Sequence, residues 1–349
     1  MARQQPAGWL RLTVAVLINV ALAAGSAAAQ TATSVPDSGT PVTAWAPPRT
    51  PWGHPDLQGV YSNDAETGTP FERPAEFEGR RIEDVTPAEL KDVNRRRNEQ
   101  FNDSVAGETF AGGLRPPTHL IFDSFERNHS RPWLVVDPPD GRVPPLTADG
   151  QRRAGIRQPN SNINPRGPFN GPEDLGLYDR CITRGIPNSM MPAGYGSTYE
   201  IVQSPDHVAI RYEMVHETRI IPLDGRPHVG PNIRLYLGNA RGWWEGNTLV
   251  VETTNFTDRT SYRGSSRDLR MIERFKPLTP DTVEWSVTFD DPATWTRPWT
   301  FAMILTRKDQ SQQGFEYACH EGNYGMRNIL AGARADDAAA LRPVDKPKP

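Results

Sequence analysis

Two polar side chains interrupt apolar strand patterns and could carry acid–base chemistry. His216 follows the alternating segment 208–214, and counting by two places it on the apolar side, with Glu217 and Arg219 on the opposite side. Glu273 lies between Met271 and Phe275 on another apolar side. An inward histidine and carboxylate that meet can act as general acid and base. The alternative is a structural histidine that is hydrogen-bonded within the core.

A second group of candidates flanks the cysteines. Cys181 and Cys319 are the only two in the chain, and an even pair in an oxidising compartment is a disulfide candidate. Two buried free thiols are the alternative. A bond would gather the polar neighbours of both cysteines into one pocket wall, namely Arg180, Arg184, His320 and Glu321.

The chemistry expected of this second group is anion binding beside acid–base catalysis. Arg180 and Arg184 could hold a carboxylate or sulfate in two-point contacts, while His320 and Glu321 join His216 and Glu273 as candidate catalytic residues. The alternative is a surface cluster of ion pairs around a structural crosslink. Two aromatic residues complete the predicted substrate contacts, Tyr212 and Trp244.

The sequence contains none of the common metal-binding, phosphate-binding or hydrolase motifs. A mixed site could combine His216, His228 and His320 with Glu217 or Glu321, but no two of these have a recognised ligand spacing. There is no glycine-rich phosphate loop, no G-x-S-x-G and no H-E-x-x-H motif. We therefore predict neither a metal nor a cofactor.

About six segments show the period of two that is typical of strands. They are 208–214, 249–254, 269–275, 283–289, 299–305 and 315–319. Each has one large apolar side, and their spacing suits hairpins. This pattern predicts a mainly β fold, an antiparallel up-and-down barrel of lipocalin-like type. A β-sandwich is the alternative, because alternation does not separate the two.

The ends of the chain predict export. Arg3 and Arg11 precede an apolar run over 12–24, and Ala27-Ala28-Ala29 offers a cleavage site before Gln30. A membrane-spanning helix needs about 20 apolar residues, and this run is shorter. We therefore predict a signal peptide, a periplasmic or secreted location, and no membrane contact after cleavage.

The remaining chain divides by composition. The signal peptide covers 1–29, followed by a disordered linker at 30–50, a proline-rich wrap at 51–198, the barrel at 199–334 and a disordered tail at 335–349. Within the wrap, Thr86 as N-cap, Pro87 and Glu89 predict one surface helix to about Asn102. The 34 prolines and 29 glycines indicate many turns.

Charge excludes one class of partner. The formal net charge is −3 over 349 residues, and nucleic-acid binding requires a clustered basic face. We therefore expect a small-molecule ligand or substrate as the partner, and the sequence leaves the oligomeric state open.

Four strings of residues occur together in a way that resembles a known family. They are RCITRG at 180–185, MVHETRIIPLDGRPH at 214–228, WEGNTLVVETTNF at 244–256 and YACHEGNY at 317–324. They resemble a widespread family of exported, functionally uncharacterised bacterial proteins, over about residues 51–333. This resemblance implies a bacterial, secreted setting and carries over no catalytic residue.

Two functions follow as hypotheses. The first is an exported enzyme of hydrolase or lyase type that acts by acid–base chemistry on a small organic or carbohydrate-like molecule in a barrel pocket. The second is a non-catalytic, lipocalin-like protein that binds a small apolar ligand. Polar groups in the lumen favour the first, and a dry aromatic lumen favours the second.

Overall fold

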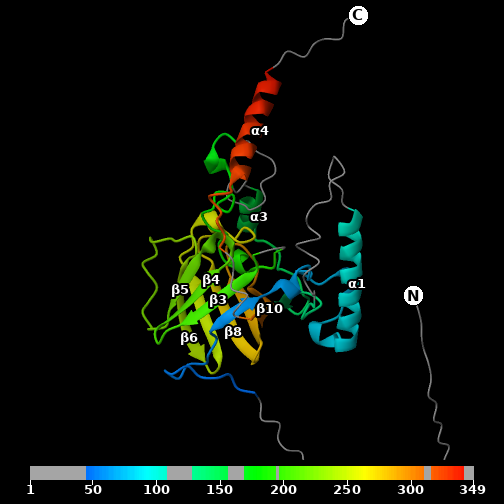
Figure 1. Cartoon of the computed structure of the whole chain (residues 1–349), viewed down its shortest axis with the longest axis vertical. Helices are drawn as coiled ribbons and strands as arrows, with labels where there is room; N and C mark the ends of the chain where they lie inside the picture. Colours follow the sequence, from blue (N-terminus) through cyan, green and yellow to red (C-terminus); the bar gives the residue numbers. More distant parts are fainter. Residues whose placement is uncertain (1–44, 108–127, 156–168, 194–195, 310–315, 342–349) are drawn as a thin grey trace, which may run out of the picture. The chain divides into compact units, whose positions relative to one another are not determined.

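The computed structural model describes residues 45–107, 128–155, 169–193, 196–309 and 316–341 (Figure 1). The predicted signal peptide and most of the predicted linker lie outside the described residues.

Nine strands of the described chain form one antiparallel ladder in the order β5-β4-β3-β1-β10-β9-β8-β7-β6. Because β1 joins β3 to β10, this order follows the chain order around a ring, as in an up-and-down barrel. The predicted barrel is confirmed. Its strands are β1 (Gly59–Ser62), β3 (Thr198–Gln203), β4 (His207–Tyr212), β5 (Thr218–Pro222), β6 (Asn239–Glu245), β7 (Thr248–Thr254), β8 (Arg270–Thr279), β9 (Thr282–Asp290) and β10 (Trp299–Arg307). A short strand, β2 (Val135–Asp137), pairs with β10 outside this path.

The ring has one seam, between β5 and β6. Eight antiparallel pairings separate these two strands along the ladder, so β5 and β6 run in the same direction. They are not hydrogen-bonded neighbours in the ladder. Instead, Ile221 of β5 and Leu223, just after the strand, pack across onto Gly242 of β6. An added Cβ there would lie 2.8 Å from Ile221 Cγ2 and 2.7 Å from Leu223 Cδ2. The seam is therefore closed by packing there.

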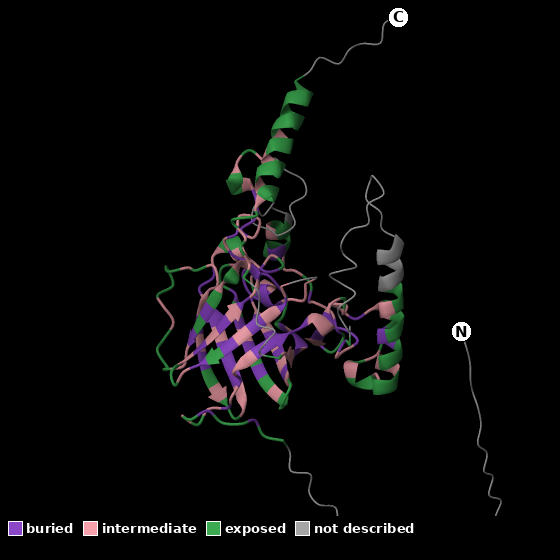
Figure 2. Cartoon of the chain, viewed as in Figure 1, coloured by how far each residue is buried: buried purple, intermediate pink, exposed green. Residues whose placement is uncertain are grey.

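Aromatic side chains fill the interior of the barrel. Trp285, Trp299, Phe275, Phe289 and Phe301 are all fully buried. Phe289 stacks on Trp299 with ring centroids 4.4 Å apart, and Trp285 meets Phe301 edge-on at 5.4 Å. Figure 2 shows the resulting alternation of buried and more exposed residues along the strands. Burial of each such side chain stabilises the fold by roughly 1.5–3 kcal/mol. This region is a packed core and not an open lumen.

The predicted surface helix is α1 (Pro87–Gly107). Thr86 Oγ1 accepts from the Glu89 amide at 3.2 Å, as an N-cap does. The Glu89 carboxylate accepts from Arg80. Val93 packs the helix onto Phe77 and Trp133, which form a second, smaller core.

The remaining described elements are two helices and seven short 3-10 turns. The helices are α3 (Ala148–Gly155) and α4 (Tyr324–Ala340), and the turns are η1 (Asp64–Glu66), η2 (Ala75–Phe77), η3 (Ile82–Asp84), η4 (Pro172–Asp174), η5 (Asn188–Met190), η6 (Met214–His216) and η7 (Asp258–Thr260). In the described residues no helix is long and apolar enough to cross a membrane.

The C-terminal segment differs from prediction in two places. The expected strand at 315–319 is not formed over its described residues 316–319. The expected disordered tail begins at 335, but α4 continues to Ala340. None of the residues of α4 is buried, so the helix forms without a core of its own, which an alanine-rich sequence favours.

Candidate functional site

The structure does not assemble the predicted His216–Glu273 pair. Strand β4 ends at Tyr212, and His216 lies exposed in η6 with Nε2 3.4 Å from Arg211 Nη1. Glu273 is fully buried inside the barrel. The inward placement of His216 was wrong because Val215 and His216 adopt positive φ angles of 61° and 58°, which end the strand and break the period of two.

Glu273 belongs to a buried polar group that we call the lumen cluster, made of Tyr212, Arg219, Thr253, Glu273 and Trp285. Arg219 Nη1 lies 2.6 Å from Glu273 Oε2, and Arg219 Nη2 donates to Thr253 Oγ1 at 2.6 Å. Trp285 Nε1 donates to Glu273 Oε1 at 3.2 Å. The carboxylate predicted to be catalytic is therefore held by an ion pair and an indole.

Arg219 was predicted to point outward, and this was wrong. The hairpin register places it opposite Ile210, and cross-strand partners share a face, so its side chain enters the barrel. Burial by itself would lower the pKa of Arg219, but Glu273 and Tyr212 outweigh it and the pKa is raised. Arg219 reaches from β5 to residues of β7 and β8, and so it links the two sides of the seam from within.

Tyr212 and Trp244 were both predicted to contact a substrate, and they occupy different ends of the barrel. Tyr212 is fully buried beside Arg219, and burial raises the pKa of its hydroxyl. Trp244 lies near the end of β6, where its ring meets His54 at a centroid distance of 5.5 Å. Strand β6 starts at the end of the barrel where β4 finishes with Tyr212, and Trp244 lies near the opposite end of β6. These two aromatic residues therefore do not line one site.

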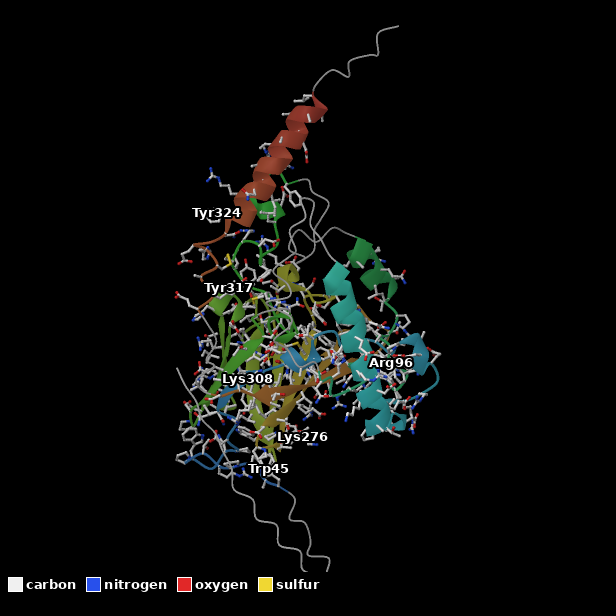
Figure 3. All side chains as sticks on the ribbon, turned by 45° about the vertical axis from the view of Figure 1, so that its right-hand side comes forward. Trp45, Arg96, Lys276, Lys308, Tyr317 and Tyr324 are labelled. Carbon is white, nitrogen blue, oxygen red and sulfur yellow. A yellow bond between two sulfur atoms is a disulfide. The ribbon has the colours of Figure 1, made fainter. Side chains whose placement is uncertain are left out.

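The predicted disulfide is present. Cys181 and Cys319 are bonded with their Cα atoms 5.7 Å apart, and Figure 3 shows the bond in yellow near Tyr317. Arg184 stacks over the Tyr178 ring at 5.4 Å, and the Tyr178 and Tyr317 hydroxyls lie 3.0 Å apart. The residues around the bond line a shallow cavity of about 380 Å³.

The polar neighbours of the disulfide form no enclosed pocket wall. His320 and Glu321 are both exposed, between Cys319 and α4. The lining of the 380 Å³ cavity comprises Tyr178, Asp179, Glu316, Tyr317, Ala318, Cys319, Gly322 and Asn323, without either predicted arginine. Arg180 is half-buried, and neither Arg180 nor Arg184 lines this cavity. The structure therefore gives no support to two-point binding of an anion by these two arginines.

A different cavity lies outside the barrel, over the seam. We call it the seam groove. Its volume is about 620 Å³, and it is lined by His207, Thr218, Arg219, Ile220, Pro222, Arg226, Val229, Leu235, Tyr236, Leu237, Gly238, Asn239, Ala240 and Arg241. Ile220 of β5 and Leu235 of the β5–β6 loop are 53% and 44% exposed, which makes this wall apolar and accessible.

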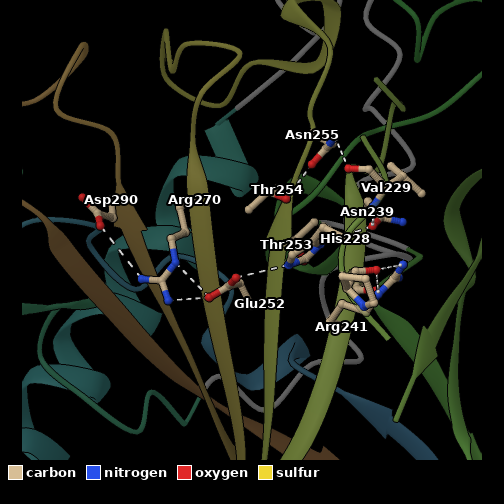
Figure 4. A network of polar contacts seen from close by, with 12 residues as sticks. His228, Val229, Asn239, Arg241, Glu252, Thr253, Thr254, Asn255, Arg270 and Asp290 are labelled. Carbon is tan, nitrogen blue, oxygen red and sulfur yellow. Dashed lines mark hydrogen bonds and ion pairs between the residues drawn. The ribbon is translucent and has the colours of Figure 1, made fainter. Parts of the chain in front are cut away.

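The loop that forms one wall of the seam groove is fixed by polar contacts (Figure 4). Asn255, at a φ of 59°, donates to the carbonyls of Val229, Gly230 and Ile233. His228 contacts Asn239 at 3.2 Å and Glu252 at 3.1 Å.

Further contacts hold the same loop on the sheet. Glu252 accepts from Arg270 at 2.8 Å, and Arg270 lies 4.0 Å from Asp290. The Leu235 amide donates to the Asn255 carbonyl at 3.0 Å. These contacts within the chain fix the loop wall of the groove, and a preformed site loses less entropy on binding.

A third cavity, of about 750 Å³, contains the buried carboxyl of Glu66. Its oxygens accept from Thr69 Oγ1 at 2.9 Å and from the Ser130 amide at 3.1 Å. Burial raises the pKa of Glu66, and these hydrogen bonds offset part of that effect. These hydrogen bonds connect η1 to Ser130, so the role of Glu66 is structural.

The histidines considered for a mixed metal site contact other residues and not one another. His228 is occupied by Asn239 and Glu252, whereas His216 lies beside Arg211. Within the described part of the chain, no three histidine, cysteine, aspartate or glutamate side chains gather in a way that could hold a metal ion.

Comparison with known proteins adds little to this geometry. No family model matches the sequence, and no curated protein matches it. One solved structure with a local likeness is a secretory abundant heat soluble protein from Ramazzottius varieornatus, at 13% identity and a TM-score of 0.23, over 32% of this chain and 70% of that chain. The barrel architecture rests on the strand pairing described above.

Sequence patterns missed the residues that line the seam groove. Ile220 and Ile221 are adjacent in β5, and only Ile221 faces the core. Two consecutive β-branched apolar residues in a short strand place one apolar side chain on each face, which indicates an apolar surface on the outer face as well. Arg241 was missed because Gly242 obscures the alternation of β6.

Proposed function

We propose that this protein is a non-catalytic binding protein for a small apolar ligand, and that the ligand binds in the seam groove. The observation that carries this proposal is a preformed groove whose wall exposes Ile220 and Leu235. Its volume of about 620 Å³ lies in the usual range of small-molecule sites, roughly 300–1,000 Å³. The packed interior of the barrel favours this outer location over a site in the lumen.

The geometry gives less support to hydrolase or lyase chemistry. Of the four residues predicted to be catalytic, Glu273 is neutralised by Arg219 inside the barrel, whereas His216, His320 and Glu321 are exposed at the surface. Acid–base catalysis requires its groups within hydrogen-bond reach of one substrate. These four side chains do not share such a place.

We also propose an exported, bacterial setting, as the N-terminal residues and the family resemblance predict. The Cys181–Cys319 bond supports this proposal, because disulfides persist in oxidising compartments. Secretion into the periplasm followed by mass spectrometry of the purified protein tests it, with a new N-terminus at Gln30 as the expected result.

Titration with Nile red, a neutral apolar dye, tests the binding proposal. The wild-type protein is expected to raise the fluorescence of the dye saturably. Ile220→Asp is expected to weaken binding roughly tenfold or more, because the substitution places a charge on the apolar wall. Ile220 is 53% exposed, so the fold tolerates the change.

The matched control is Ile329→Asp on α4, where the isoleucine is also partly exposed, at 39%, but lies far from the groove lining in sequence and is absent from it. This variant is expected to bind the dye as the wild type does. Equal binding by Ile220→Asp and wild type would show that the groove is not the site.

A further inference from the structure

The seam groove has an uneven charge distribution. Its lining includes four basic residues, His207, Arg219, Arg226 and Arg241, and no aspartate or glutamate. Carboxylates outside the lining contact three of the four. Asp206 lies 3.0 Å from His207, Asp224 accepts from Arg226 Nε at 2.6 Å, and Glu273 holds Arg219 within the barrel.

Arg241 is the exception. Its guanidinium donates only to backbone carbonyls, with Nε 3.0 Å from the Arg226 and Pro227 oxygens, Nη2 2.8 Å from the Pro227 oxygen and Nη1 2.6 Å from the Ala240 oxygen. Among the described residues no carboxylate oxygen lies within 4.0 Å of the Arg241 guanidinium, and the more distant Asp224, which pairs with Arg226, acts on it only weakly. Burial and the neighbouring Arg226 lower the pKa of Arg241, and Asp224 offsets part of that effect. An arginine of this kind keeps its charge at neutral pH.

The carbonyl contacts orient this cation and leave donors available. A guanidinium has five N–H donors. The contacts above use the Nε–H and one N–H on each terminal nitrogen, so one N–H on each terminal nitrogen has no acceptor among the described residues. Two such donors match the two oxygens of a carboxylate.

We propose that the ligand of the seam groove is an anionic amphiphile, a long-chain carboxylate. Its hydrocarbon chain lies over Ile220 and Leu235, and its carboxylate accepts from Arg241. This proposal rests on the proposed function and adds the chemical class of the ligand. Charge complementarity with Arg241 selects the anion, and the exposed apolar wall selects the chain.

Calorimetric titration with decanoate and with decan-1-ol, both below aggregation, separates the two proposals. The chains match and only the head group differs. For the wild type we expect decanoate to bind roughly tenfold or more tightly than decan-1-ol, as a charged hydrogen-bonded contact provides. Added salt is expected to weaken only decanoate binding.

Two variants assign the preference to Arg241. Arg241→Gln is expected to reduce the ratio of the two affinities towards one. Arg274→Gln removes an outward arginine of β8 that pairs with Glu245 at 2.6 Å, and is expected to keep the wild-type ratio. Circular dichroism verifies that both variants fold, and Arg241→Lys, which keeps the charge, is expected to retain part of the preference.

Each outcome has a distinct meaning. If decan-1-ol binds the wild type as tightly as decanoate, the anionic class is wrong and the groove remains a site for apolar ligands. If Arg241→Gln keeps the wild-type preference for decanoate, or if the Arg274→Gln control loses it, Arg241 is not the anion contact. If neither compound binds the wild type, the proposed function also fails.

Discussion

Arg219 and Glu273 form an ion pair in an interior built mainly from aromatic and aliphatic side chains. Their exposed fractions are 3% and 0%, so each charge depends on the other for compensation. Removal of ions from water is costly, and a buried pair of this kind is often worth no more than a well-packed apolar pair. Its position across the seam suggests a role in fixing how β5 meets β7 and β8.

Substitution of one partner is therefore expected to be much worse than substitution of both. Glu273→Ala should lower the free energy of unfolding by about 3–5 kcal/mol, because Arg219 is left as an unpaired buried charge. The double variant Arg219→Met with Glu273→Met should recover most of this loss. Urea unfolding followed by tryptophan fluorescence measures both, and a nearly neutral Glu273→Ala would contradict the structural role of the pair.

Glu66 makes a prediction about pH. Burial raises its pKa in the folded protein above the ordinary value of 4.5. Below that pH the carboxyl is protonated in both states, but on raising the pH the unfolded chain ionises first, so the free energy of unfolding falls until the folded carboxyl also ionises. Glu66→Gln lacks this carboxyl, and its stability should fall less as the pH rises above 4.5.

Urea midpoints over a pH series measure this difference, and Glu78→Gln is the control of opposite sign. Hydrogen bonding from Arg142 lowers the pKa of the exposed Glu78 carboxyl. The contribution of Glu78 to the free energy of unfolding is therefore lost as the pH falls through this lowered pKa, which lies below the ordinary glutamate pKa of 4.5. Identical slopes for wild type and Glu66→Gln above pH 4.5 would mean that Glu66 ionises alike in both states.

At the level of elements, the disulfide anchors a segment that has little else to hold it. Helix α4 has no buried residue. Besides the Cys181–Cys319 bond, this segment is tied by the Tyr317 hydroxyl, 3.0 Å from that of Tyr178. Asn323 donates to the Asp179 carbonyl at 2.7 Å, and Arg334 donates to the Asn170 carbonyl at 3.1 Å. The barrel itself packs without this helix.

Replacement of both cysteines by serine is therefore expected to expose residues 316–341 to proteases before the barrel unfolds. Limited proteolysis with mass spectrometry should show cleavage in this segment at least several-fold faster than in the wild type. The bond closes 138 residues of sequence, so loss of global stability, up to about 4–5 kcal/mol on the chain-entropy model, should accompany it. Equal cleavage rates in oxidised and serine forms would show that other contacts anchor α4.

At the level of the whole molecule, an odd number of strands prevents complete antiparallel closure. Nine strands leave one junction where neighbours run in the same direction, and here that junction is the β5–β6 seam. The loop from β5 must return to the end of the barrel where β5 began before β6 can start. That return path forms the wall of the seam groove, so the groove is a consequence of the topology.

Gly242 tests how the seam closes. An added Cβ at this position would lie under 3.0 Å from both Ile221 and Leu223, so Gly242→Ala should destabilise the fold by about 1–3 kcal/mol through overpacking. Gly322→Ala is the control, because its Cβ would meet nothing within 4 Å. Thermal unfolding compares the two. Equal melting temperatures would show that the seam can open without cost.

The strand patterns determined much of the fold without the structure. Five of the six predicted strands exist, namely β4, β7, β8, β9 and β10, because their alternation is strong enough to be recognised locally. The helix from Pro87 and the inward position of Glu273 also follow from local sequence. Strands β1, β2, β3, β5 and β6 were not predicted, since each is short or mixes apolar residues on both sides.

What the sequence determined by itself is the class of the fold: mainly antiparallel β, with one pair of cysteines that could bond. The ring of strand pairings decided for a barrel over a sandwich, and the structure shows that Cys181 and Cys319 are bonded. Tertiary structure decided which residues share a site. A period of two holds only within a strand, and the turn at 213–217 shifted it, so His216 faces solvent and Arg219 faces the core. The seam, its groove and the open donors of Arg241 depend on the number of strands in the ring, which no local pattern contains.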